Sequence, residues 1–200
     1  MRYLAISILF LATLAGCTTP YAVVEETDKF ADPNKPARYA LRSNDILRNE
    51  IGISHGDLLD PYVERDRKTG KVISTGFVLL RTVSEPELIW IGAPKWLGIR
   101  PGDEIEFLAD GERIAFKAVS ARTYHNFGYY NGANMTKYFD QAVYTSEPQQ
   151  FAKIANAKNI EIKVNGGNGN TVYPSNNARM PDSFYENLRR FYIEQVEPFL

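Results

Sequence analysis

The chain has few of the residues on which most protein chemistry depends. Its 200 residues include one cysteine and two histidines. An internal disulfide therefore cannot form, and a zinc site, which takes three or four nitrogen or sulfur ligands, is not expected. The 23 Lys and Arg residues nearly balance the 24 Asp and Glu residues. Because a nucleic-acid-binding protein needs a basic stripe, no nucleic-acid partner is expected, and no sequence feature indicates a cofactor or a metal.

Long apolar runs are also scarce, and the clearest one lies at the N-terminus. Arg2 is followed by a mostly apolar run over residues 4–14, and then by the small residues Ala15 and Gly16. About 20 residues are needed to span a bilayer, so this run is too short. A positive start, a short apolar middle and small residues at the end are typical of a signal peptide.

The run Leu14-Ala15-Gly16-Cys17 resembles the lipobox of bacterial lipoproteins. The resemblance implies that residues 1–16 are removed and that Cys17 becomes acylated, with chains such as palmitate on its thiol and its new amine. Two or more such chains hold a protein firmly at a membrane. The alternative is an ordinary secretory signal with a chance cysteine.

The same resemblance implies a location and a domain organisation. An Asp after the cysteine tends to retain a lipoprotein in the inner membrane, so Thr18 implies the periplasmic face of the outer membrane. The inner membrane and a Gram-positive cell surface stay open as alternatives. We expect a lipidated tether over residues 17–28 and a single β-rich periplasmic domain over residues 29–200.

Alternation of apolar and polar residues predicts antiparallel strands. Strands are expected at 72–83 and 136–145, and a hairpin is expected where Asp110-Gly111 separates two alternating runs. A further strand pair is expected on either side of the Asn- and Gly-rich turn 165–170. This turn does not open a helix, so it is not predicted to bind phosphate.

Two helices are expected late in the chain. Residues 147–157 place apolar side chains on one face, and residues 183–197 form a longer amphipathic helix that would cover the core. Because strands dominate, the predicted fold class is mainly β (α+β), as an antiparallel sandwich or a strongly bent sheet with these two helices.

The segment 124–135 interleaves aromatic residues with Asn and Gly, a composition that contact loops favour. We therefore expect a binding loop here, suited to a sugar or a peptide. The alternative is a loop whose rings fold back onto the sheet. The candidate binding residues are Tyr124, His125, Phe127, Tyr129, Tyr130 and Asn131.

Catalytic residues are harder to identify. Ser54-His55-Gly56-Asp57 contains the residue types of a hydrolase triad, but the members of a triad must converge, whereas sequence neighbours usually point in different directions. An enzyme would then have to use dispersed carboxylates. The candidates are Asp57, Asp60, Glu104 and Asp140.

These observations favour a binding or interaction module, held at the membrane by acylated Cys17. Its partner could be another envelope protein, peptidoglycan or a secreted macromolecule. Two alternatives stay open: an envelope hydrolase or its accessory that uses the dispersed carboxylates, and a structural subunit of an envelope or secretion machine.

Overall fold

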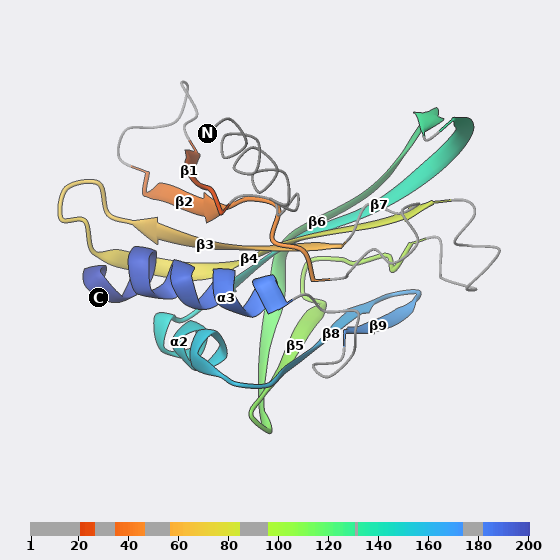
Figure 1. Ribbon diagram of the computed structural model, residues 1–200. Coiled ribbons are helices and arrows are strands. Elements are labelled where there is room, and N and C mark those ends of the chain that lie inside the picture. The colour runs from red at the N-terminus through yellow and green to blue at the C-terminus, as the bar shows by residue number, and fades with distance from the viewer. Residues whose placement is uncertain (1–20, 27–34, 47–56, 85–95, 131, 174–181) are drawn as a thin grey trace, which may run out of the picture.

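The computed structural model describes residues 21–26, 35–46, 57–84, 96–130, 132–173 and 182–200 (Figure 1). These residues form nine strands in one antiparallel sheet, in the order β1-β2-β3-β4-β7-β6-β5-β8-β9. The predicted mainly β fold is thereby confirmed. The strands are β1 (Val23–Glu26), β2 (Ala37–Leu41), β3 (Leu58–Arg65), β4 (Val72–Ser84), β5 (Glu104–Ala109), β6 (Glu112–Tyr130), β7 (Ala133–Ser146), β8 (Ile160–Gly166) and β9 (Gly169–Tyr173).

The sheet bends at β6, which is shared by its two halves. Residues 112–117 of this strand pair with β5, and the residues from Ala118 onward pair with β7. The register shifts between Ala118 and Ser120, and such a bulge bends a strand and increases its twist. The two halves then face each other, since the ring of Phe77 on β4 lies 4.9 Å from that of Phe107 on β5. Of the two predicted architectures, the molecule has the strongly bent sheet.

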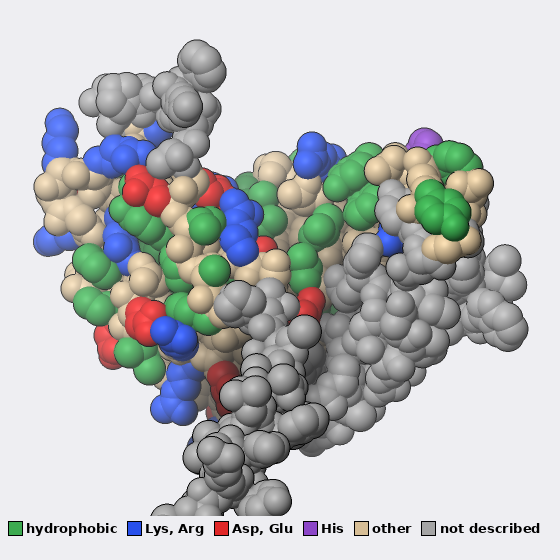
Figure 2. Space-filling model, turned by 45° about the horizontal axis from the view of Figure 1, so that its top comes forward, with side chains coloured by type: hydrophobic (Ala, Val, Ile, Leu, Met, Phe, Trp, Pro, Cys, Tyr) green, Lys and Arg blue, Asp and Glu red, His purple; other side chains and the backbone are tan. Residues whose placement is uncertain are grey.

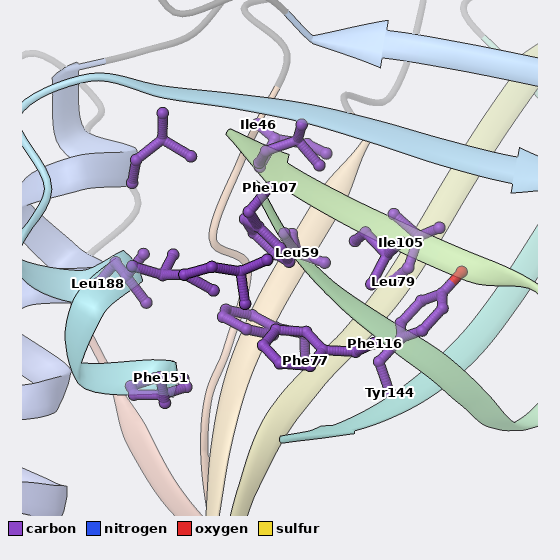
Figure 3. Close-up of a cluster of buried hydrophobic side chains, with 14 of the residues drawn as sticks. Ile46, Leu59, Phe77, Leu79, Ile105, Phe107, Phe116, Tyr144, Phe151 and Leu188 are labelled. Carbon is purple, nitrogen blue, oxygen red and sulfur yellow. The ribbon is translucent and has the colours of Figure 1, made fainter. Parts of the chain in front are cut away.

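The core fills the space between the two halves of the sheet and the helices (Figure 3). Phe77 stacks on Phe151 at 5.2 Å, and Phe107 lies 5.7 Å from Phe116. Leu188 closes the same cluster from the C-terminal helix. Burial of these large side chains is the main stabilising contribution available to a chain that cannot form an internal disulfide.

The short helix α2 (Pro148–Asn156) confirms the prediction at 147–157. Phe151, Ile154 and Ala155 are buried on one face, at the spacing that brings residues onto the same side of a helix. The face contacts β4 and β5, so α2 holds the two halves of the sheet together.

The C-terminal helix α3 (Asp182–Phe191) confirms the prediction at 183–197, although its winding changes before the chain ends. It continues as a π turn, η1 (Tyr192–Val196), and a 3₁₀ turn, η2 (Glu197–Phe199). Arg65 contacts this end: its guanidinium donates hydrogen bonds to the backbone oxygen and the side chain of Gln195. The same guanidinium lies 3.6 Å from the ring centroid of Phe199.

The N-terminal boundary differs from the predicted one. Val23–Glu26 falls within the expected tether, yet it forms β1 and pairs with β2. Tyr21 is packed as well, since the guanidinium of Arg190 lies 4.0 Å above its ring, and burial raises the pKa of Tyr21. Tyr21 and residues 23–26 are therefore packed on the domain, although they fall within the predicted tether. Cys17 lies outside the described residues, four positions before Tyr21.

Candidate functional site

The aromatic segment 124–135 was predicted to be a loop, and this prediction is wrong, because the segment forms the ends of two paired strands. Residues 124–130 continue β6, and β7 begins at Ala133, so only two positions are left for the turn. Gly132 in this turn has a φ of 86°, the left-handed conformation that a tight hairpin turn requires and that glycine adopts without strain. The two arms of the segment, on β6 and β7, pair with each other because their aromatic residues favour a pleated strand.

This β6–β7 hairpin projects from the sheet (Figure 1). Strand β4 pairs with β7 only as far as the pair of Ser84 and Lys137. Beyond it, within the described ranges, the hairpin pairs only with itself, ending at Tyr130 and Ala133. Among the described residues, the end of the hairpin is thus a two-stranded ribbon.

One face of the hairpin is built around Tyr124. Its ring stacks on that of Phe139 at 4.8 Å and an angle of 8°. The guanidinium of Arg122 lies 5.2 Å from the Tyr124 ring centroid and donates a 2.7 Å hydrogen bond to Gln141. Tyr124 is 38% exposed, so on this face the ring partly folds back onto the sheet.

The opposite face carries a longer row of rings. Trp96 packs edge-on against Tyr138 at 5.3 Å and lies 6.5 Å from His125. Its indole N–H also donates to the backbone oxygen of Tyr124 at 3.4 Å. Trp96 therefore supports the hairpin at its base. No sequence signal indicated this contact, because Trp96 and His125 come together only through the fold.

Phe127 and Tyr129 extend this row toward the turn and are the most exposed rings among the hairpin side chains that the structure describes. Their exposed fractions are 67% and 72%. Figure 2 shows hydrophobic side chains gathered with a histidine at this end of the surface. Of the other predicted binding residues, Tyr130 ends β6 and Asn131 lies outside the described residues.

Asp140 holds the base of the hairpin. Its fully buried carboxylate forms a 3.1 Å ion pair with Arg81 and accepts hydrogen bonds from the backbone N–H groups of Leu97 and Gly98, at 2.8 and 3.2 Å. A buried charge is costly unless it is paired and hydrogen-bonded. Asp140 therefore fixes the segment that carries Trp96, which is a positioning role.

The other dispersed carboxylates also have structural partners. Asp57 accepts hydrogen bonds from the Thr82 N–H at 2.9 Å and from the Tyr173 hydroxyl at 2.6 Å. Asp60 accepts one from the backbone N–H of Asn44 at 2.7 Å, while burial raises its pKa. Glu104 lies 3.5 Å from the guanidinium of Arg113 at the surface. Asp57 and Asp140 lie in the same buried surroundings, around Tyr173 and Arg81, whereas Asp60 and Glu104 serve separate contacts.

The region of Ser54 and His55 lies outside the described residues. The run from Gly52 to Gly56 has the Gly-x-Ser-x-Gly spacing of a nucleophile elbow, in which a helix follows the serine. Here the chain after Ser54 leads into a strand, β3, which begins at Leu58. A nucleophile elbow would require a helix at this place.

The described residues offer neither a metal site nor a helical membrane span. They contain no group of three or more His, Cys, Asp or Glu side chains that could hold a metal ion. None of their helices is long and apolar enough to cross a bilayer. The lipobox itself lies outside them.

Comparison with known proteins adds no relative: no family model, no curated protein and no solved structure matches the chain. The exposed rings of the hairpin are the strongest candidate for a contact surface among the described residues.

Proposed function

We propose that this protein is a lipid-anchored envelope protein that works by binding, and that the β6–β7 hairpin is its binding surface. The observation that carries the proposal is the exposure of Phe127 and Tyr129, at 67% and 72%, on a strand pair that stands clear of the sheet. The partner is a component of the bacterial envelope, such as another protein or peptidoglycan.

The anchor supports the location of this surface. Cys17 follows a short apolar run and two small residues, and acyl chains on it would hold the domain at a bilayer without a spanning segment. Thr18 in place of Asp favours the periplasmic face of the outer membrane.

The hairpin suits binding because its rings are held in place before any partner arrives. Tyr and Phe offer large contact areas at a low cost in side-chain entropy. The cross-strand stack of Tyr124 on Phe139 and the packing of Trp96 on Tyr138 stiffen the ribbon below the exposed pair. A pre-organised surface loses less conformational entropy on binding.

A photo-crosslinking experiment in intact cells tests the surface. Benzoylphenylalanine in place of Tyr129 is expected to capture an envelope component on illumination. The matched control carries the same probe in place of Ile73, which is 51% exposed elsewhere on the sheet. If position 129 gives no more adduct than position 73, the hairpin is not the binding surface.

The anchor is tested separately. A Cys17→Ser variant is expected to leave the membrane fraction, and mass spectrometry of the wild type is expected to find acyl chains on Cys17. A wild-type protein with a free thiol at Cys17 would contradict the anchor.

A further inference from the structure

The N-terminal end of β1 and the turn of the hairpin lie at the same end of the sheet. Four antiparallel pairings lead from β1 through β2, β3 and β4 to β7, so β1 and β7 run in the same sense. Strand β7 begins at the hairpin turn. The N-terminal end of β1, which leads back to Cys17, therefore lies at the end of the sheet from which the hairpin projects.

The strand register allows the length of the hairpin to be compared with that of the segment between Cys17 and β1. Val24, Ala40, Tyr62, Gly76 and Thr145 form one row across five strands. From this row β7 extends back over twelve residues to Ala133, or about 40 Å at ~3.4 Å per residue.

The tether is shorter than this. Cys17 precedes Val24 by seven residues, which span at most about 25 Å when fully extended. The hairpin thus reaches further from the row than the anchored cysteine can. A bilayer entered by acyl chains at Cys17 is within reach of the hairpin tip.

The chemistry of the hairpin suits a lipid headgroup region. Residues 119–139 include the exposed Arg122, the buried Lys137 and no acidic residue, so an anionic surface would not repel the hairpin. Aromatic rings with one apolar and one polar end are enriched at membrane interfaces. Tyr129 presents such a ring at the tip, beside the wholly apolar ring of Phe127.

We propose that the hairpin tip dips into the headgroup layer of the bilayer that holds Cys17, so that the domain is attached at two points and its orientation is fixed. This inference rests on the proposed function, because it requires the acyl anchor. It identifies the first partner of the hairpin as a lipid surface.

The test uses the acylated full chain on vesicles of phosphatidylethanolamine and phosphatidylglycerol. Acylation consumes the only native thiol, so a Phe127→Cys variant has one free thiol for an environment-sensitive fluorophore. The control is Leu108→Cys. Leu108 is 42% exposed on β5 and lies beside the opposite end of β6, since it pairs with Arg113.

The label at position 127 is expected to shift its emission to the blue on the vesicles and to be quenched by lipids with brominated tails. The label at position 108 is expected to behave as it does in water. If the protein floats with the vesicles but both labels stay in water, this inference fails while the anchor stands. If the protein carries no acyl chains, both the anchor and this inference fail.

A second measurement does not depend on acylation. Unacylated Cys17→Ser protein is expected to bind the same vesicles weakly, and a further change of Phe127 and Tyr129 to serine is expected to lower that binding by about tenfold or more. An Ile73→Ser, Val172→Ser pair, exposed by 51% at each position, is the matched control. Equal losses in the two pairs would overturn the inference.

Discussion

Replacement of Gly76 by alanine is expected to destabilise the domain by about 2–3 kcal/mol. Gly76 lies in β4 between Tyr62 of β3 and Thr145 of β7. The ring of Tyr62 lies across the glycine, and its hydroxyl forms a 3.0 Å hydrogen bond with the Thr145 hydroxyl. The tyrosine therefore occupies the space that a side chain at position 76 would need.

The magnitude follows from these contacts. A Cβ atom at position 76 would lie 2.0 Å from the backbone oxygen of Tyr144 and 2.7 Å from the ring of Tyr62. Because ordinary contacts need about 3.5 Å, both the ladder to β7 and the ring must move. Overpacking of this kind costs about 1–3 kcal/mol, and loss of the hydroxyl bond adds roughly 1 kcal/mol. Alanine recovers about 0.4–1 kcal/mol by reducing the entropy of the unfolded chain.

Urea unfolding of Gly76→Ala and Gly167→Ala measures the difference. A Cβ atom at Gly167 would meet its nearest neighbours, on Arg100 and Gly98, at 3.6 Å, which is ordinary contact. Both variants change the unfolded chain in the same way, so the comparison isolates packing. Gly167→Ala is expected to be neutral or slightly stabilising. If the two variants have the same free energy of unfolding, the packing argument at Gly76 is refuted.

Two further changes test the electrostatics of the fold. Asp140→Asn removes the carboxylate that pairs with the guanidinium of Arg81, whose side chain is 4% exposed, and is expected to cost about 3–5 kcal/mol in urea unfolding. A loss below about 1 kcal/mol would contradict the positioning role. Glu106 accepts hydrogen bonds from Arg113 at 2.7 Å and from Asn165 at 2.8 Å, and these lower its pKa from 4.5 to about 2. Its stabilising contribution is therefore complete above pH 4.5 and is lost as the pH falls toward 2. Glu106→Gln is expected to be less stable than the wild type at neutral pH and to lose less stability over that range, whereas parallel acid unfolding curves would contradict the assignment.

Local patterns predicted several elements correctly. The Asp110-Gly111 hairpin forms as expected, with φ values of 48° and 88° at its two central residues, as a type I′ turn requires. Ile105 and Phe107 are buried while Glu104 and Glu106 face outward, so the alternation indicated the correct face. These features depend on residues close in sequence, so the local sequence pattern is enough to predict them.

The candidate site was predicted only in part. The aromatic segment was recognised by its composition, but its form was wrong, because a loop and a hairpin with a two-residue turn share the same Asn and Gly residues. The ion pair of Asp140 with Arg81 and the packing of Trp96 on Tyr138 left no local signal. Both contacts join residues more than 40 positions apart, which no periodicity relates.

The sequence by itself determined the antiparallel strands, the two late helices and the candidate anchor at Cys17, because each depends on a pattern within a few neighbouring residues. Only the tertiary structure decided that β6 serves both halves of the sheet, that β1 belongs to the sheet, and that the aromatic segment projects as a ribbon. The physical reason is that a strand pairs with whichever strand completes its backbone hydrogen bonds and buries its apolar face. That choice depends on the whole chain.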